Sequence, residues 1–295
     1  MEHSEQSVRS QVGALGAALD FTDKVVLVTG AGAGIGNATA VRFGQAGATV
    51  VVVEHDAERA EQVHAVLDGA DVPNRVVVAD ATAVSTAKDV ARLIDDELDG
   101  LDVLVNNVGD FLRVIGPFES TSDDDIERLY AVNLRHVLTM TRECIPLLRR
   151  RAPGSSIISV SSIEGLRGMP NAVVYGAFKA ALTGFTQSLA VELGHEGIRV
   201  NQIAPETTDS RQVPLARLVP PGSEALASCW IPQGRFGVPT DHADAILFLA
   251  SPLAAWVNGV SLPVDGGARA AGGWYRSPAG GFTNMPPLAA QPPVP

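Results

Sequence analysis

The chain has 295 residues, of which 46% are hydrophobic, and it carries a formal net charge of −11. Its length and hydrophobic content suffice for one large domain with a full core. The acidic excess argues against nucleic acid or an anionic membrane surface as a partner, because both would repel the protein. The two cysteines provide no disulfide framework, and the six histidines show no metal-ligand spacing, so no metal site is expected.

The N-terminal segment, MEHSEQSVRSQ, is polar and lacks the basic stretch and apolar run of a secretion signal. No apolar run in the chain approaches the length of a membrane span. We therefore expect a cytoplasmic protein without a membrane partner. Residues 1–20 are expected to form a flexible tail, and residues 21–268 to form one domain.

Seven short runs rich in β-branched residues are predicted to be strands. They are residues 24–29, 48–53, 75–79, 102–106, 156–161, 198–203 and 260–264. The runs are continuous rather than alternating, which is expected when helices cover both faces of a sheet. Helical segments lie between them, so the pattern predicts an α/β fold with a doubly wound, parallel, seven-stranded sheet.

A glycine turn, VTGAGAGIG, follows the first strand and opens a helix. Gly30, Gly34 and Gly36 fit the spacing G-x3-G-x-G, and no Lys-Ser/Thr pair follows as it would in a P-loop. Glycines let the backbone approach a pyrophosphate, and a helix N-terminus offers unpaired N–H groups. The turn therefore predicts a dinucleotide site, and a purely structural turn is the alternative.

Glu54 ends the second predicted strand. A carboxylate there can accept both ribose hydroxyls of an adenosine, and it would repel a 2′-phosphate. No Arg or Lys lies in the glycine turn or directly after Glu54, so the sequence favours NAD over NADP. A solvated acid at the end of the strand is the alternative. Asp80, after the third strand, is a second candidate for contact with the adenine.

The segment VVYGAFKAAL, residues 173–182, places Tyr175 and Lys179 four residues apart in an apolar helical pattern. Residues at this spacing share one helix face. Ser162 closes the fifth strand, and ligands bind at the carboxyl ends of strands in such sheets, so Ser162 is expected to face the same crevice. A Tyr packed under a Lys side chain is the alternative for the pair.

Asn133 is unusual because it lies on an apolar stripe at helical spacing. Asn is a poor residue within a helix, and a buried amide needs hydrogen-bond partners. A purely structural buried Asn is the alternative to a role in a site. The stripe consists of Ile126, Tyr130, Val137, Met140 and Cys144.

Together these motifs resemble the single-domain, NAD-dependent branch of the short-chain dehydrogenase/reductase family over roughly residues 21–267. The resemblance rests on TGAGAGIG, NNVG at 106–109, Asn133, SVSS before YGAFK, and a late GRFGVP, FLAS and NGVSLPVDGG. It implies a Rossmann-like fold and an NAD cofactor. Epimerase-like relatives space the glycines differently, and enoyl reductases space Tyr and Lys more widely.

The resemblance also implies roles for single residues. Tyr175 would be the acid/base, Ser162 a hydrogen-bond donor to the substrate oxygen, and Lys179 a ligand of the nicotinamide ribose. Asn133 would hold a proton-relay water. The implied cofactor-binding set also includes Ile35, Asn107, Gly109, Pro205, Thr208 and Ser210.

The Tyr–Lys spacing has a physical rationale. An unperturbed Tyr has a pKa near ~10, which makes it a poor base at neutral pH. A unit positive charge at about 4 Å and an effective dielectric of ~20 is worth roughly 4 kcal/mol, or ~3 pKa units. We therefore expect Lys179, with the cationic nicotinamide, to bring the pKa of Tyr175 toward working pH.

Glu206 departs from the family pattern, because a glycine usually follows the proline after the sixth strand. The Glu206 side chain is expected to be solvated, to pair with Arg211 or Arg167, or to face the substrate. Residues 211–233 occupy the region that forms a substrate lid in the family. The substrate side of the site is therefore the part that the resemblance predicts least well.

The sequence thus predicts an NAD-dependent dehydrogenase for a secondary alcohol that is cyclic or hydrophobic, such as a hydroxysteroid, a cyclic alcohol or a dihydrodiol. The alternatives are a ketone reductase working in the opposite direction and a catalytically silent NAD-binding regulator. A homotetramer is expected by resemblance alone.

Residues 269–295 are rich in Gly and Pro and are expected to form an irregular C-terminal extension. A segment of this composition cannot build its own core. Its large side chains are predicted to dock near a subunit interface, with a disordered end as the alternative. They are Trp274, Tyr275, Phe282 and Met285.

Overall fold

The fold was obtained as a computed structural model, which describes residues 16–210, 212–219, 221–223, 228–273, 275–277 and 281–283. A parallel sheet runs through its centre. The strands are β1 (Val25–Thr29), β2 (Thr49–Glu54), β3 (Asn74–Val78), β4 (Val103–Asn106), β5 (Ser156–Val160), β6 (Arg199–Pro205) and β7 (Ser261–Val264).

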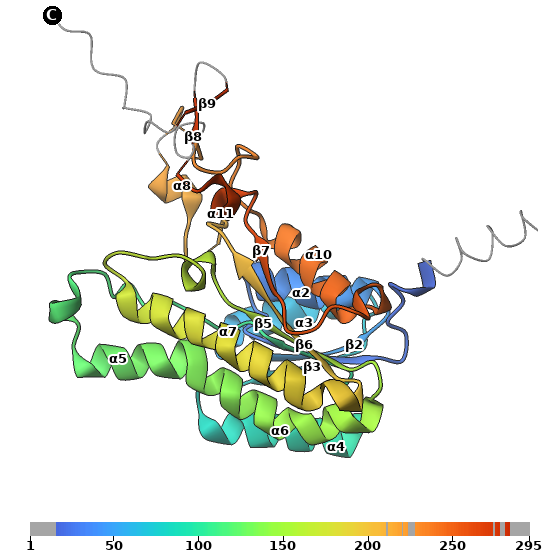
Figure 1. The fold of residues 1–295 in the computed structure, drawn as a ribbon. Coiled ribbons are helices and arrows are strands. Elements are labelled where there is room, and N and C mark those ends of the chain that lie inside the picture. Colours follow the sequence, from blue (N-terminus) through green and yellow to red (C-terminus); the bar gives the residue numbers. More distant parts are fainter. Residues whose placement is uncertain are drawn as a thin grey trace, which may run out of the picture.

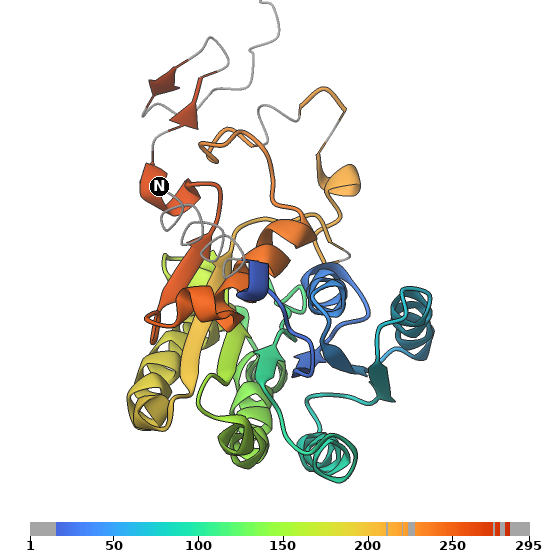
Figure 2. The same cartoon turned by 90° about the vertical axis from the view of Figure 1, so that its right-hand side faces the viewer.

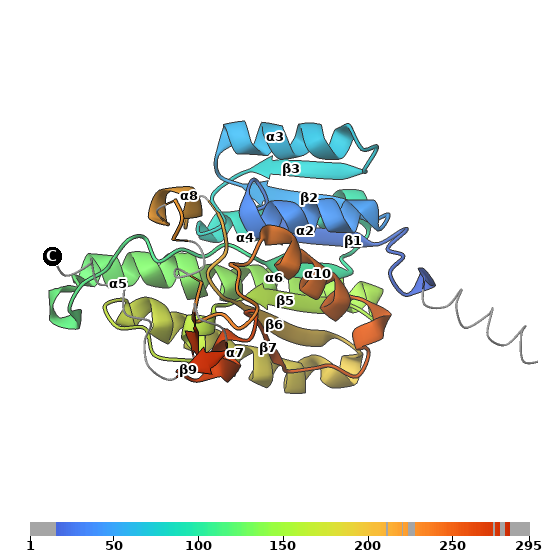
Figure 3. The same cartoon turned by 90° about the horizontal axis from the view of Figure 1, so that it is seen from above.

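The strand order is β3-β2-β1-β4-β5-β6-β7, and every neighbouring pair is parallel (Figure 3). This topology confirms the predicted doubly wound sheet, and the strand boundaries agree with the sequence to within two residues. The order reverses between β1 and β4. In such sheets a crevice opens at this switch point, beyond the carboxyl ends of the strands.

Helices cover both faces of the sheet, as Figure 2 shows. One layer is formed by α2 (Gly34–Gln45), α3 (Ala57–Asp68) and α10 (Pro239–Ala250), and the other by α4 (Val84–Leu98), α6 (His136–Arg151) and α7 (Val173–Leu193). Two apolar cores result, one on each face. In β1, Val26 and Val28 face the first core whereas Leu27 faces the second, which explains the continuously apolar strands.

The predicted stripe around Asn133 is not one regular helix. It consists of α5 (Asp123–Tyr130), the π-helical segment η2 (Ala131–Arg135) and α6. In the π segment the N–H of His136 bonds to the carbonyl of Ala131, five residues earlier. Such one-turn π segments are common at functional sites, and this one contains Asn133.

Shorter elements complete the described chain. They are the 3₁₀ turns η1 (Phe118–Ser120), η3 (Ile163–Gly165), η4 (Gly194–Glu196) and η5 (Pro252–Ala254), and the short helices α8 (Leu215–Leu218) and α11 (Ala268–Ala271). Among the helices that the structure describes, none is both long and apolar enough to cross a membrane.

The C-terminal extension contains regular structure in its described part. After α11, β8 (Tyr275–Arg276) and β9 (Phe282–Thr283) pair in antiparallel fashion, beyond the end of β7 and apart from the main sheet (Figure 1). The Arg276 N–H donates a hydrogen bond of 2.7 Å to the Cys229 carbonyl, so the extension contacts the last part of the predicted lid. Trp274, Met285 and the Phe282 side chain lie outside the described residues, and so does the docking predicted for them.

Candidate active site

A cavity of about 970 Å³ lies beyond the carboxyl ends of the strands. All predicted site residues line it except Gly36 and Asn133, which lie behind its wall. The lining members of the predicted set are Gly30, Gly34, Ile35, Glu54, Asp80, Asn107, Gly109, Ser162, Tyr175, Lys179, Pro205, Thr208 and Ser210. Segments that are far apart in the sequence are thus brought to one site by the parallel topology.

The glycine turn forms the wall between β1 and α2. No side chain caps the first turn of α2, so the helix N-terminus faces the cavity without a competing side-chain acceptor. A Cβ on Gly36 would lie 2.3 Å from the Gly30 carbonyl oxygen, so only glycine allows the helix to pack this closely. A Cβ on Gly34 would meet only Ser210, at 3.9 Å. The space over Gly34 is thus open and fits a phosphate group.

Tyr175 and Lys179 lie on the first turns of α7, and Ser162 precedes η3 at the end of β5. Ser162 lies close enough to the Tyr175 phenol to lower its pKa, and the Ser162 Oγ accepts the Glu164 N–H at 3.2 Å. The Lys179 Nζ is buried, lies 5.7 Å from the centroid of the Tyr175 ring and donates a 3.1 Å hydrogen bond to the Val160 carbonyl. The structure therefore brings the three predicted residues into one cluster.

Lys179 alone does not bring the pKa of Tyr175 toward working pH. Burial raises the pKa of Tyr175 to about 12, the Ser162 hydrogen bond lowers it, and the charges of Glu164 and Asp110 raise it. Burial also lowers the pKa of Lys179 to about 8. The sequence argument placed the two groups in partly aqueous surroundings, whereas desolvation dominates both pKa values here.

Asn133 is fully buried, and its side-chain amide is already bonded. Its Oδ1 accepts the Asp110 N–H at 3.1 Å, and its Nδ2 donates to the carbonyls of Asp110 and Leu129, at 2.7 Å and 3.0 Å. The amide therefore fixes the turn that follows β4. Any contact of Asn133 with a relay water would have to use its backbone carbonyl.

Glu54 lies at the other end of the cavity and is 2% exposed, so the solvated alternative is wrong. Its Oε2 accepts the Gly32 N–H and its Oε1 accepts the Asp56 N–H, both at 3.0 Å. The Arg59 Nη2 lies 3.1 Å from Oε1. Sequence reasoning missed Arg59, because it searched only the glycine turn and the residues next to Glu54.

Glu206 forms an ion pair. Its Oε2 lies 2.8 Å from the Nη2 of Arg167, which also pairs with Glu164 at 2.7 Å. Its Oε1 accepts hydrogen bonds from the Thr207 N–H and hydroxyl, at 2.8 Å and 3.0 Å. The solvated alternative is wrong because Glu206 is 8% exposed. Arg211 lies outside the described residues.

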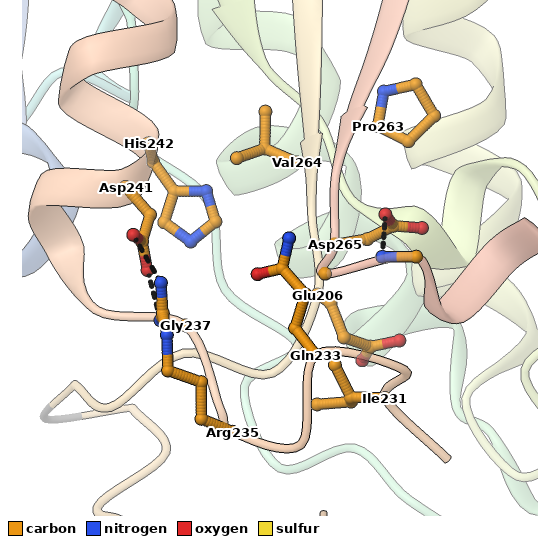
Figure 4. Close-up of a pocket in the computed structure, with 12 residues that line it drawn as sticks. Glu206, Ile231, Gln233, Arg235, Gly237, Asp241, His242, Pro263, Val264 and Asp265 are labelled. Carbon is orange, nitrogen blue, oxygen red and sulfur yellow. Dashed lines mark hydrogen bonds and ion pairs between the residues drawn. The ribbon is translucent and has the colours of Figure 1, made fainter. Parts of the chain in front are cut away.

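A second cavity, of about 360 Å³, lies behind Glu206 (Figure 4). His242 lines it, and the His242 Nε2 lies 2.6 Å from the hydroxyl of Thr208. That hydroxyl donates to the Glu206 carbonyl at 2.7 Å, which assigns the imidazole proton to Nε2. Burial lowers the pKa of His242 to about 4, so a neutral imidazole fixes Thr208 from behind.

The substrate side of the large cavity is formed by a loop after β4 that sequence reasoning also missed. Phe111 packs edge-on against Tyr175, with ring centroids 6.4 Å apart. The Asp110 Oδ1 accepts the Leu112 N–H at 2.6 Å, and Leu112 and Arg113 adopt left-handed φ angles of 52° and 55°. Side chains in this conformation are uncommon and often mark functional sites. No sequence signal for this loop was available, since neither residue is Gly or Asn.

Within the described part of the chain, no group of three or more His, Cys, Asp or Glu side chains is arranged to hold a metal ion. The chemistry of the cavity is instead that of a half-buried phenol, an ammonium group and a hydroxyl at one end and a carboxylate at the other.

Comparison with known proteins places the chain in a family. The family model described as "Enoyl-(Acyl carrier protein) reductase" matches residues 30–269. The 3-oxoacyl-[acyl-carrier-protein] reductase FabG of Thermotoga maritima is 35% identical over 83% of this chain and 97% of its own length. Galactitol 2-dehydrogenase of Agrobacterium fabrum is 33% identical over 84% of this chain and 98% of its own length.

Solved structures of dehydrogenases are similar to this chain over most of its length. A dehydrogenase/reductase from Sinorhizobium meliloti 1021 superimposes with a TM-score of 0.79 at 33% identity, over 87% of this chain and 99% of that one. A 7α-hydroxysteroid dehydrogenase complexed with NADH superimposes with a TM-score of 0.77 at 32% identity, over 84% of this chain and 95% of that one. A short-chain dehydrogenase from Burkholderia cenocepacia J2315 complexed with NADP superimposes with a TM-score of 0.76 at 32% identity, over 84% of this chain and 99% of that one. The chain belongs to the short-chain dehydrogenase/reductase family and is an oxidoreductase acting on alcohol or ketone substrates.

Proposed function

We propose that this member of the short-chain dehydrogenase/reductase family uses NAD to interconvert a secondary alcohol and its ketone. The observation that carries the proposal is the cluster of Tyr175, Ser162 and Lys179 at one end of a cavity whose other end holds Glu54. The Tyr-x3-Lys spacing supports chemistry at a CH–OH group over the enoyl reduction named by the family model.

The open glycine turn, Glu54, Asn107, Thr208 and Lys179 fit a dinucleotide and would hold it. When bound, the nicotinamide supplies the acceptor or donor of the hydride. Tyr175 takes the proton of the substrate hydroxyl during oxidation and returns it during reduction. Ser162 positions the substrate oxygen next to that phenol.

A cyclic or otherwise hydrophobic substrate is supported by the apolar side chains on this side of the cavity. Phe111, Leu112, Met169 and Val213 line it, and Phe111 packs against Tyr175. A ring packed on Phe111 would bring a secondary hydroxyl within reach of the phenol. Its relatives include a galactitol dehydrogenase and a hydroxysteroid dehydrogenase, whose substrates differ widely, so the proposal rests on the lining of this chain's own cavity.

One observation favours reduction as the second candidate. With a pKa of about 12, Tyr175 is protonated at neutral pH and is ready to donate its proton to a ketone.

A catalytically silent NAD-binding protein is the remaining alternative, and the assembled cluster argues against it. Turnover should be measured with NAD and NADP on cyclic alcohols, and with NADH and NADPH on the matching ketones. Absence of turnover with all pairs, together with measurable NADH binding, would favour the silent protein.

The pH profile should respond to Glu164. The charge of Glu164 raises the pKa of Tyr175, so Glu164→Gln should lower that pKa. Because the phenolate is the base for alcohol oxidation, the rising limb of kcat/KM should move to lower pH, by about half a unit to one unit. Asp110→Asn should act in the same direction, and the exposed Glu119→Gln should leave the limb in place. A limb that stays fixed or moves to higher pH in Glu164→Gln would contradict the electrostatic account.

Glu206 should affect stability more than substrate choice, because both of its oxygens already have partners. Glu206→Gly should lower the free energy of unfolding by about 1–3 kcal/mol through the lost hydrogen bonds and ion pair. It should lower kcat/KM for a diol and for its mono-alcohol analogue by the same factor. Arg167→Gln is the matched control, since it breaks the same pair from the other side. A loss confined to the diol would show that Glu206 contacts the substrate.

We also propose self-association, as expected for a homotetramer. Phe248, Leu253 and Trp256, on and after α10, are exposed, and Trp256 is 100% exposed. Large apolar side chains exposed along one segment of the chain support burial against another copy. Sedimentation of the wild type and of Trp256→Ser should show an oligomer that the substitution weakens; a monomeric wild type would contradict this proposal.

A further inference from the structure

Arg59 lies beside Glu54 at one end of the large cavity. It belongs to the first turn of α3, and its side chain is 20% exposed. One end of the guanidinium pairs with the Glu54 Oε1 at 3.1 Å, and its Nε lies 3.2 Å from an Asp56 carboxylate oxygen. His55 lines the same corner and contacts both Glu54 and Arg59, at 3.1 Å and 3.3 Å. The corner therefore holds both a buried carboxylate and a guanidinium that is neutralised by it.

The pair is packed directly on the glycine turn. A Cβ on Gly32 would lie 2.6 Å from the Glu54 Oε2 and 2.7 Å from the Arg59 Cβ, so no other residue fits there without moving them. Glu54 Oε2 also accepts the Gly32 N–H. The carboxylate is thus held in one position by the backbone of the turn and of Asp56. The Arg59 guanidinium, in contrast, is held at this corner by the side chains of Glu54, Asp56 and His55.

We infer that Arg59 is a latent phosphate anchor, and that the charge of Glu54 keeps it from acting as one. The inference rests on the proposed use of NAD. A guanidinium binds a phosphate dianion well, but here it is already paired with Glu54, which would also repel the 2′-phosphate of NADP. Removing the charge of Glu54 therefore has two effects: the repulsion ends, and the Arg59 Nη2 loses its partner at Glu54 and can bind the phosphate while the Nε keeps its pair with Asp56.

The inference differs from a simple repulsion by Glu54. If repulsion alone selects NAD, neutralising Glu54 improves NADPH binding by the same factor whether or not Arg59 is present. If Arg59 is the anchor, most of the gain disappears when Arg59 is replaced. A double-mutant cycle separates the two cases.

The test is direct binding of NADH and NADPH to the wild type, Glu54→Gln, Arg59→Met and the double variant, by titration of cofactor fluorescence. Adenosine 2′,5′-bisphosphate and 5′-AMP serve as probes of this end of the cavity alone. Glu54→Gln should tighten NADPH and the bisphosphate by at least ~10-fold, a scale typical of a charge-assisted contact. In the Arg59→Met background the same change should gain no more than ~3-fold. Binding of 5′-AMP should change little with Arg59→Met.

Equal gains in the two backgrounds, or no gain in a folded Glu54→Gln protein, would overturn the inference. Gln cannot accept both backbone N–H groups as Glu54 does, so Glu54→Ser repeats the cycle if Glu54→Gln unfolds early. Arg75→Met is the matched control, since the Arg75 pair with Glu97 is exposed and outside the cavity lining. The proposed use of NAD is tested separately by the wild type, which should bind NADH at least ~30-fold more tightly than NADPH.

Discussion

Tyr175→Phe is expected to lower kcat by at least ~10³-fold and to leave the dissociation constant of NADH within about twofold of the wild-type value. Only the phenolic oxygen is removed. The aromatic ring keeps its edge-on contact with Phe111 and its place on α7, so the cavity keeps its shape. The substrate hydroxyl then has no group to take its proton, because Ser162 is a much weaker base and Lys179 donates to the Val160 carbonyl.

Steady-state turnover in both directions and NADH titration together test this prediction. Tyr130→Phe is the matched control. Tyr130 packs on Phe178 at 5.6 Å outside the cavity lining, so its hydroxyl should be dispensable. More than a few per cent of the wild-type kcat in Tyr175→Phe would show that another group is the acid/base.

The architecture could be predicted from the sequence because strands that are covered by helices on both faces have a recognisable apolar pattern. A central strand covered on both faces is expected to be largely apolar rather than alternating, and β1 and β2 show this directly in the chain. The glycine turn was visible for a similar reason, since close approach of the backbone at Gly36 admits only one residue type. Tyr175 and Lys179 were found because four residues in a helix bring two side chains to one face.

The sequence could not show which charged side chains from distant segments form ion pairs in the folded protein. Arg59 pairs with Glu54 only because α3 turns back over the end of β2, and Arg167 reaches Glu206 from a different connection. The same holds for the pKa of Tyr175. Helical spacing gives the distance between two charges, whereas the sign of the shift depends on how completely the folded protein excludes water from them.

The conformation of the loops could not be predicted from the sequence for a different reason. The left-handed residues Leu112 and Arg113 are held by a hydrogen bond from the Leu112 N–H to Asp110, so tertiary context overrides the local preference of their side chains. The π segment around Asn133 is equally hidden, because one additional residue per turn leaves the apolar spacing almost unchanged.

Lys179→Met should produce an enzyme that is more stable at neutral pH and nearly inactive. Burial lowers the pKa of Lys179 from 10.5 to about 8, so holding the charged form in the folded protein costs roughly 3 kcal/mol at ~1.4 kcal/mol per unit. The hydrogen bond to the Val160 carbonyl offsets about 1 kcal/mol of that cost. Replacement by Met, which has a similar length and no charge, should therefore raise the free energy of unfolding by about 2 kcal/mol.

The pH dependence makes this prediction specific. Below pH 8 the side chain is protonated in both the folded and the unfolded state, so the full penalty is present in the wild type. Between pH 8 and 10.5 the unfolded state binds more protons than the folded state, so wild-type stability relative to Lys179→Met rises with pH. The advantage of the variant should thus be largest at pH 7 and should fade above pH 10. Chemical denaturation at pH 7, 8.5 and 10 measures it, with the exposed Lys88→Met as the control that should show no such trend.

The loss of function should accompany the gain in stability. Without the ammonium group the nicotinamide ribose loses its proposed ligand and the phenol loses its only cationic neighbour within the cluster, so NADH affinity and kcat should both fall, the latter by at least ~10²-fold. This is the pattern of a residue kept for chemistry at the expense of the fold. A variant that is less stable than the wild type at pH 7 would show that the charge of Lys179 is stabilised by its surroundings. In that case the cluster around Tyr175 would be a structural ion network, and the assignment of Lys179 to the reaction would lose its physical basis.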